Sequence, residues 1–262
     1  MGIWAPTPGC SVALRALLWD VDGTLAETER DGHRLAFNRA FAEADLPIHW
    51  DQDAYGTWLQ VSGGHERIQA QLAALEGLAP DPQRVAALQA AKQRHYQQLL
   101  ASGALQLRPG VAALLLEAQQ AGLVQAIVTT SARSAVQGLM DHVLGSLAQV
   151  FAFWICGEDV QDKKPHPEAY GLALDRLSHL GVVDRGDQVL VLEDSAHGLA
   201  AAHAAGLPAL LTLSHYGASD RQLNWACARA VVTDLGPAGK VLVGPSCHQG
   251  QITLSYLQAL QR

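Results

Sequence analysis

The sequence predicts an α/β fold that carries an inserted all-helical segment. Apolar, β-favouring runs alternate with helical patterns from about Gly122 to Leu235, as expected of βαβ units. Between Arg30 and Ala101, in contrast, apolar residues recur at helical spacing and no convincing strand is visible. The chain should therefore consist of a strand-bearing core and a helical insert.

The first predicted strand is Leu17-Leu18-Trp19, which ends abruptly in Asp20 and Asp22. Side chains at positions i and i+2 of a strand point to the same side, so these two acids should project together. They would repel each other unless a cation or a shared proton relieves them, which suggests Mg²⁺ or a division of roles between them. This is the outline of a phosphoryl-transfer site. The alternative is an ordinary Asx turn at Asp22-Gly23.

The helical insert contains three clearly periodic stretches, at residues 34–41, 68–75 and 85–100. The chain should leave the core near Ala26–Arg30 and return to it near Gly103–Leu107. Leu107-Arg108-Pro109-Gly110 then interrupts the pattern, and a helix is expected after it.

Three further segments place polar residues beside predicted strands or turns. The apolar run at 126–128 ends in Thr129, Thr130 and Ser131, and the run at 189–192 ends in Glu193 and Asp194. Between them, Lys164 stands directly before a proline-fixed turn. Each segment alone has an ordinary explanation as a helix cap, a solvated face or an acidic N-cap. Their order along the chain is the informative feature.

With the four motifs in this order, the chain resembles the haloacid dehalogenase-like superfamily over about residues 14 to 236. The resemblance implies a doubly wound, Rossmann-like and mostly parallel sheet, with the motifs at the carboxyl ends of its strands. It also implies a core domain at 13–28 and 104–236 and a helical cap domain at 29–103. Residues 237–262 form a C-terminal extension to which the sequence gives no role, and Pro6, Pro8 and Gly9 indicate a loose arm over residues 1–12.

The resemblance assigns roles to the motif residues. Asp20 corresponds to the nucleophile, and Asp22 to the general acid/base whose presence favours a phosphotransferase over a metal-independent dehalogenase. Mg²⁺ would be held by Asp20, the backbone carbonyl of Asp22, and Asp194 with help from Glu193. The transferring phosphate would be bound by Thr129, Thr130, Ser131 and Lys164. A carboxylate is a weak nucleophile toward an anionic phosphoryl group, so these positive and hydrogen-bonding groups are needed.

The cap should choose the substrate, because the core motifs contact only the transferring phosphate. Gly63, Gly64, His65 and Arg67 could present amides and positive charge to a second anionic group. Lys92 stands one helical turn from Tyr96, and Glu27 and Glu29 lie at the hinge, where they could bind sugar hydroxyls. The alternative is that His65 is a surface loop residue and that Lys92 and Tyr96 belong to an exposed helical face.

Residues 26–38 and 63–68 resemble the branch that contains the xylulose-1,5-bisphosphate phosphatases of carbon fixation, within the helical-cap subfamily of β-phosphoglucomutase. The implied reaction converts xylulose-1,5-bisphosphate to xylulose-5-phosphate and phosphate, in the context of the Calvin cycle. In that branch the residue after the paired glycines is commonly lysine. His65 is mostly neutral at pH 7, which weakens this contact, although Arg67 and Lys92 could compensate.

Several other functions stay open. A β-phosphoglucomutase or a phosphoglycolate phosphatase would use the same motifs, and a catalytically silent binding module would keep the same fold. The mutase predicts no net release of phosphate, whereas the silent module predicts no Mg²⁺-dependent turnover at all. A dehalogenase is disfavoured by Asp22 and the second acidic pair.

Composition restricts the partners of the chain. The net charge is −7 over 262 residues, and no basic block is present, which argues against a nucleic-acid surface and for a small phosphorylated sugar as partner. Neither a transmembrane run nor a signal peptide is visible, so we expect a soluble cytoplasmic protein. Its four cysteines, Cys10, Cys156, Cys227 and Cys247, form no C-x-x-C pair and fit a reducing compartment. A monomer is the default expectation.

Overall fold

The computed structural model describes residues 13–220, 224–247 and 250–261. The arm expected at residues 1–12 therefore lies outside the described residues. Within the described part of the chain, seven strands form one sheet in the order β3-β2-β1-β4-β5-β6-β7. These strands are β1 (Ala16–Trp19), β2 (Val124–Val128), β3 (Phe151–Ile155), β4 (Val189–Glu193), β5 (Ala209–Thr212), β6 (Ala230–Val232) and β7 (Val241–Val243).

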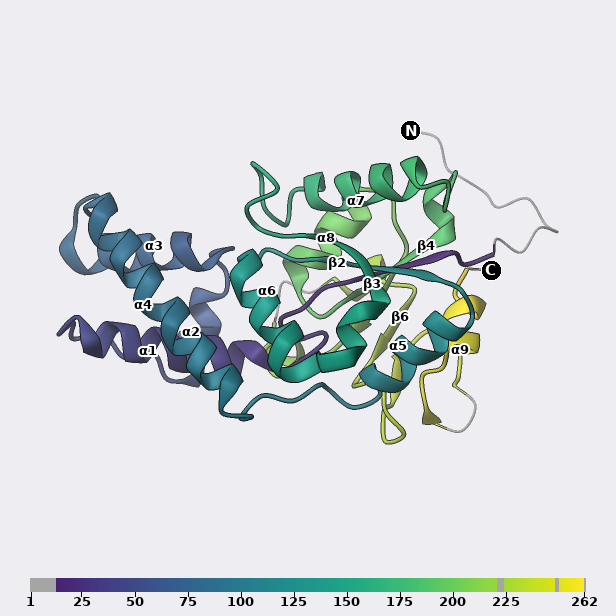
Figure 1. The fold of residues 1–262 in the computed structure, drawn as a ribbon, viewed down its shortest axis with the longest axis horizontal. Helices are drawn as coiled ribbons and strands as arrows, with labels where there is room; N and C mark the ends of the chain where they lie inside the picture. Colours follow the sequence, from purple (N-terminus) through teal and green to yellow (C-terminus); the bar gives the residue numbers. More distant parts are fainter. Residues whose placement is uncertain (1–12, 221–223, 248–249, 262) are drawn as a thin grey trace.

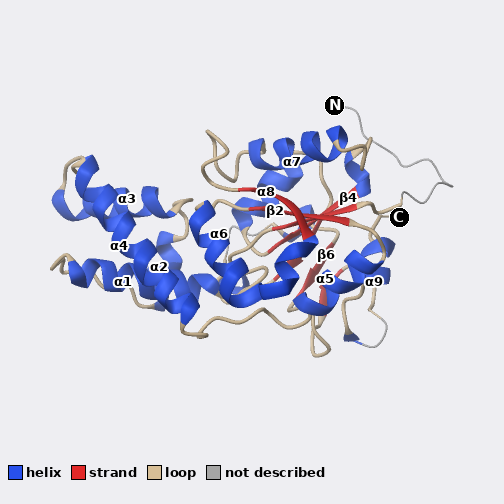
Figure 2. Ribbon diagram, viewed as in Figure 1, coloured by secondary structure: helices blue, strands red, loops and turns tan. Residues whose placement is uncertain are grey.

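The sheet is parallel except at its last pair. The central strand β1 pairs in parallel with β2 on one side and with β4 on the other, and β6 and β7 pair antiparallel. The strand order reverses direction beside β1, as in a doubly wound fold. Figure 2 shows the strands at the centre with helices around them. The predicted α/β fold with a doubly wound parallel sheet is confirmed.

Helices cover both faces of the sheet (Figure 1). The helices α5 (Val111–Gln120), α6 (Arg133–Leu139) and α9 (Leu254–Ala259) pack on one face, and α7 (Glu168–His179) and α8 (Ala196–Ala204) on the other. In β1, Leu17 and Trp19 join the first apolar cluster, whereas Ala16 and Leu18 join the second. This alternation explains why β1 is apolar throughout, because a strand covered on both faces has no solvent side.

The insert between β1 and β2 is helical, as predicted. It contains a π-helical turn at Glu29–His33 and the helices α1 (Arg34–Glu43), α2 (Gln52–Trp58), α3 (Gly64–Glu76) and α4 (Pro82–Ala101). Figure 1 shows it projecting to one side of the sheet. The side chains of Asp51 and Asp81 cap α2 and α4, and Phe37, Trp50 and Ile68 belong to an apolar cluster of the insert's own. The exact domain boundaries stay a prediction.

The C-terminal extension completes the core. Its strand β7 extends the sheet beyond β6, and the backbone N–H of Leu254, at the start of α9, donates to Glu117 of α5 at 2.8 Å. Leu257 of α9 is fully buried in the cluster beneath the sheet. The extension is thus part of the folded core, a role that its glycine- and proline-rich sequence did not indicate.

The structure bears on two features noted in the sequence, the lack of a transmembrane run and the cysteines. No helix among the described residues has both the length and the apolar character needed to span a membrane. Cys156 is a free thiol, and burial raises its pKa to about 12. Cys10 lies outside the described residues.

We expect Gly110→Ala to destabilise the protein more than Gly122→Ala. Both glycines have positive φ values, 82° and 75°, so alanine costs about 1 kcal/mol of strain at either position. A Cβ at Gly110 would also lie 2.2 Å from the carbonyl of Leu235, whereas Gly122 has nothing within 4 Å. The clash adds about 1–3 kcal/mol. Urea unfolding should show the larger loss for Gly110→Ala, and equal losses would contradict the explanation.

Candidate active site

The predicted motif residues meet at one edge of the sheet. Trp19 of β1 is in register with Ile127 of β2 and with Leu192 of β4, so the residues that follow these strands lie side by side. They open into a cavity of about 510 Å³, a volume within the range of small-molecule sites. Six of the predicted core residues are among those that line it: Asp20, Asp22, Thr129, Thr130, Lys164 and Asp194. Ser131 and Glu193 are not part of the lining.

Lys164 lies at the centre of the site. Its Nζ donates to Asp20 Oδ1 at 2.8 Å, to Glu193 Oε1 at 2.6 Å and to the carbonyl of Val128 at 2.7 Å. Burial alone would lower the pKa of Lys164, but the charges of Asp20 and Glu193 outweigh burial and raise that pKa. Lys164 is therefore a fixed cation next to the side chain of Asp20.

Three buried carboxylates lie together at the site, and Lys164 contacts two of them, Asp20 and Glu193. Oxygens of Asp20, Glu193 and Asp194 all lie within 4.8 Å of one another. Burial raises the pKa of Asp20 and of Asp194, and the charge of Glu193 raises both further. Because Lys164 pairs with only two of these three acids, the group has the oxygen donors and the excess negative charge that suit Mg²⁺. The side chain of Asp22 is not part of this group.

Asp22 is held instead by residues on the side of the insert. His33 Nε2 lies 2.9 Å from its Oδ1, and the hydroxyls of Thr28 and Ser131 donate to its two oxygens. Burial would raise the pKa of Asp22, but His33 and these hydrogen bonds lower it below its ordinary value. Ser131, predicted to bind phosphate, thus contacts Asp22 in this arrangement. Sequence reasoning missed Thr28 and His33 as partners of Asp22.

Behind His33 lie Lys92 and Tyr96 of α4. Lys92 Nζ is 2.9 Å from His33 Nδ1, and the ring of Tyr96 stacks on the imidazole at a centroid distance of 4.0 Å. Both side chains are buried, so the alternative that they form an exposed helical face is wrong. Burial lowers the pKa of Lys92 to about 8. Lys92 is not among the residues that line the cavity.

Four predicted substrate-binding residues face the cavity from the insert and hinge: Glu27, Glu29, Gly63 and Arg67. Arg67 is buried and donates to the Tyr55 hydroxyl at 2.8 Å and to the carbonyl of Val61 at 3.2 Å. Its guanidinium lies 3.7 Å from Glu29. Gly64 begins α3 outside the lining. His65 is exposed, as the surface alternative predicted, but it lies in α3 and not in a loop.

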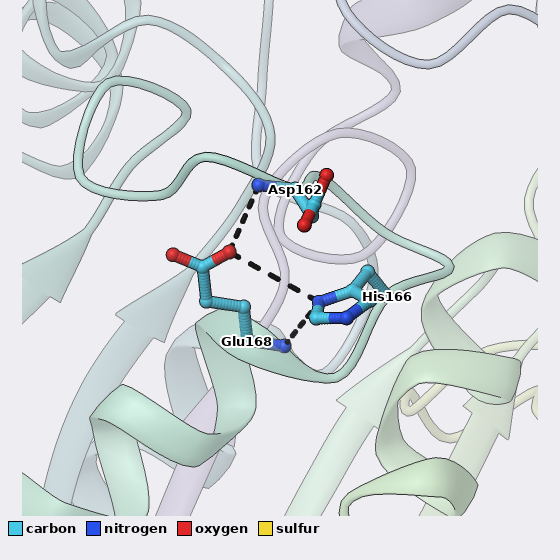
Figure 3. Close-up of side chains that lie close together, drawn as sticks. All are labelled: Asp162, His166 and Glu168. Carbon is cyan, nitrogen blue, oxygen red and sulfur yellow. Dashed lines mark hydrogen bonds and ion pairs between the residues drawn. The ribbon is translucent and has the colours of Figure 1, made fainter.

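The loop that carries Lys164 is braced from within (Figure 3). The carboxylate of Glu168 accepts the backbone N–H groups of Gln161 at 3.0 Å and of Asp162 at 2.8 Å. The backbone N–H of Glu168 donates to His166 Nδ1 at 3.3 Å. Although Asp162, His166 and Glu168 cluster like metal ligands, they are largely exposed and these bonds already account for Glu168. Their evident effect is to fix the loop.

Arg108 is a further buried residue that the sequence did not assign to the site. It donates to the carbonyls of Gly23, Leu213 and Thr233, and it lies 3.6 Å from Glu27. These bonds tie the loop after β1 to the loops after β5 and β6. The arrangement fixes the backbone that presents Asp20 and Asp22, and the proline-glycine turn at Arg108 gave no signal of it.

This chain is similar in sequence to known proteins. Residues 14–206 match the family of haloacid dehalogenase-like hydrolases. The chain is 41% identical to protein CbbY of Rhodobacter capsulatus over 226 residues, which cover 86% of this chain and 95% of that protein. It is 40% identical to the plasmid-borne CbbY of Cupriavidus necator, over 79% of this chain and 81% of the relative.

A solved structure shows the same similarity. It is a mutant of CbbY from Rhodobacter sphaeroides in complex with xylulose-(1,5)bisphosphate, and it is 36% identical to this chain with a TM-score of 0.74. The match covers 84% of this chain and 94% of the other.

Proposed function

The chain belongs to the haloacid dehalogenase-like hydrolases, and we propose that it is a Mg²⁺-dependent sugar bisphosphate phosphatase that works through an aspartyl phosphate. One observation carries the proposal: Lys164 joins Asp20 to Glu193 in a buried acidic group that opens into a cavity shared with the helical insert. The preferred substrate is xylulose-1,5-bisphosphate, as the ligand of the similar CbbY structure suggests.

In the first half-reaction, an oxygen of Asp20 forms a bond to phosphorus while the bond to the sugar oxygen breaks. Lys164 orients Asp20 and places positive charge beside the transferring group. Thr129 and the neighbouring backbone amides would donate to the remaining phosphoryl oxygens. Asp20, Glu193 and Asp194 would hold Mg²⁺, which would neutralise negative charge on those oxygens when bound.

Asp22 would move the proton in both half-reactions. It would protonate the sugar alkoxide that leaves, and it would then take a proton from the water that attacks the aspartyl phosphate, releasing phosphate and Asp20. The bonds from Thr28, His33 and Ser131 keep Asp22 ionised. A substrate that displaced them would raise its pKa and allow it to carry the proton.

The cavity also supports recognition of a second phosphate. Arg67 is a buried guanidinium on the wall formed by the insert, and Glu27 and Glu29 are placed to accept bonds from sugar hydroxyls. We infer that Arg67 contacts the distal phosphate, since His65 is exposed and Lys92 is buried behind His33. The replacement of a lysine by His65 therefore carries less weight than the sequence suggested.

The test is phosphate release with Mg²⁺ from xylulose-1,5-bisphosphate, ribulose-1,5-bisphosphate, β-glucose-1-phosphate and phosphoglycolate at equal concentrations. We expect the highest kcat/KM for the first. If another ester is hydrolysed with a higher kcat/KM, the phosphatase mechanism still holds and that ester is the preferred substrate. Isomerisation of glucose phosphate without net phosphate release would instead identify a mutase.

Removing divalent metal should abolish turnover. With EDTA we expect phosphate release to fall at least about 100-fold, because the three buried acids then face the phosphate while Lys164 pairs with only two of them. Excess Mg²⁺ should restore the rate. Asp194→Asn should raise the Mg²⁺ concentration needed for half-maximal rate, whereas Asp162→Asn, in the exposed group, should not. Full activity in EDTA would exclude the proposed use of metal.

A further inference from the structure

A direct ion pair joins the insert to the loop that carries Lys164. Lys163 Nζ lies 2.5 Å from Glu66 Oε1, although the two residues are 97 positions apart in the sequence. Glu66 is in the first turn of α3, and Lys163 is the immediate neighbour of Lys164. The pair therefore connects the wall of the cavity formed by the insert to the phosphate end of the site.

The ion pair is packed against the backbone of Gly63. A Cβ at this position would lie 2.2 Å from Glu66 Oε2 and 2.8 Å from Lys163 Nζ, and the φ of Gly63 is +94°. Glu66 Oε2 is itself buried and has no hydrogen-bond partner among the described residues. Lys163 thus holds one oxygen of the Glu66 carboxylate, and the other oxygen is packed against Gly63, although the Glu66 side chain as a whole is 41% exposed.

Each partner is next to residues that the proposed reaction uses. Glu66 lies between Gly63 and Arg67, which both line the cavity. Lys163 lies in the loop that Glu168 braces and directly precedes Lys164, whose own bonds to Asp20 and Glu193 hold its side chain in place. Loss of the ion pair should therefore allow the start of α3, which carries Arg67, to move relative to the loop that carries Lys164.

We propose that Glu66 is a positioning residue that docks the start of α3 on the Lys164 loop. The docked arrangement places Arg67 over the cavity while Lys164 is aligned on Asp20, so that binding of the distal part of a substrate is coupled to phosphoryl transfer. This inference rests on the proposed function, since it assigns the contact a role in the same reaction.

The first test compares substrates of two sizes. Glu66→Gln and Lys163→Met should each lower kcat/KM for the sugar bisphosphate about fivefold, mainly through KM, which is what loss of a partly exposed ion pair allows. For an aryl phosphate too short to reach Arg67, kcat/KM should change less than about twofold. The charge-swapped double variant, Glu66→Lys with Lys163→Glu, should recover most of the loss.

A matched control exists in the insert itself. Glu76 forms an ion pair with Arg84 within the insert, so Glu76→Gln removes a comparable pair without touching the core. It should leave both substrates unaffected. The proposal is overturned if the charge-swapped variant does not recover kcat/KM for the sugar bisphosphate. It is also overturned if the Glu66 and Lys163 variants lower kcat/KM equally for both substrates.

Hydrogen exchange decides the inference without any assay of activity. Glu66→Gln should speed exchange of amides in residues 161–168, and Lys163→Met should speed that of residues 62–67, by about threefold or more, because coupling is reciprocal. Glu76→Gln should do neither. An active enzyme without this reciprocal effect would refute the docking role. The reciprocal effect in a protein that hydrolyses no phosphate ester would instead refute the proposed function and leave the docking contact standing.

Discussion

Asp20→Asn should reduce phosphate release by about 10⁴-fold or more. The amide has the shape of the carboxylate but no anionic oxygen to attack phosphorus, and loss of a covalent nucleophile has effects of this size or larger in other hydrolases. Lys164 would keep its bonds to Glu193 and to the carbonyl of Val128, so its position should survive the change. Steady-state phosphate release at saturating Mg²⁺ measures the loss.

Folding provides the internal control for this variant. Burial and the neighbouring acids raise the pKa of Asp20 and outweigh the charge of Lys164, which lowers that pKa, so the ionised form costs stability at neutral pH when no metal is bound. Asp20→Asn should therefore unfold at a temperature no lower than the parent in EDTA. Asp175→Asn, on the exposed surface of α7, should leave turnover unchanged. Activity of Asp20→Asn within tenfold of the parent would refute the aspartyl-phosphate mechanism.

The core of the candidate site could be predicted because it depends on strand ends. Once three apolar runs are assigned to parallel strands, Asp20, Thr129 and Glu193 must appear at one edge of the sheet. The register of β1 with β2 and β4 then determines only how far each of these residues lies along that edge. Lys164 was identified by its place before a proline and by its order among the motifs, which the family resemblance supplied.

The partners of Asp22 could not be predicted in the same way. Thr28 and His33 reach it because the chain turns through a short π-helical segment at the start of the insert, and no periodic pattern marks that turn. Lys92 reaches His33 from a helix 59 positions further along, through tertiary packing alone. Ser131 was correctly placed near the site, but its hydroxyl is directed to Asp22.

The cap residues show that helical phase decides which side chain faces a cavity. The sequence singled out both His65 and Arg67, but it did not indicate where α3 begins. Because α3 starts at Gly64, Arg67 faces inward one turn after Gly63 while His65 faces solvent. β7 was missed for a different reason, since a strand of three residues carries too little pattern to be identified from the sequence.

Asp22→Asn should separate the two half-reactions. Asparagine cannot take a proton from water, so hydrolysis of the aspartyl phosphate should slow about 10²- to 10⁴-fold. With an aryl phosphate, whose phenolate leaves without a proton, formation of the aspartyl phosphate should remain fast. We therefore expect a burst of phenolate of about one equivalent per enzyme, followed by slow turnover.

The phosphorylated protein that should accumulate in Asp22→Asn tests the role of Asp22 directly. Acid quenching during the slow phase should yield a phosphorylated protein whose phosphate maps to Asp20, and Asp20→Asn should give neither the burst nor the adduct. In the Asp22→Asn variant the new amide oxygen can still accept from Thr28 or Ser131, so the loop should keep its conformation. Rapid turnover without an adduct would show that another group activates the water. A burst with an unchanged slow phase would limit Asp22 to protonation of the leaving group.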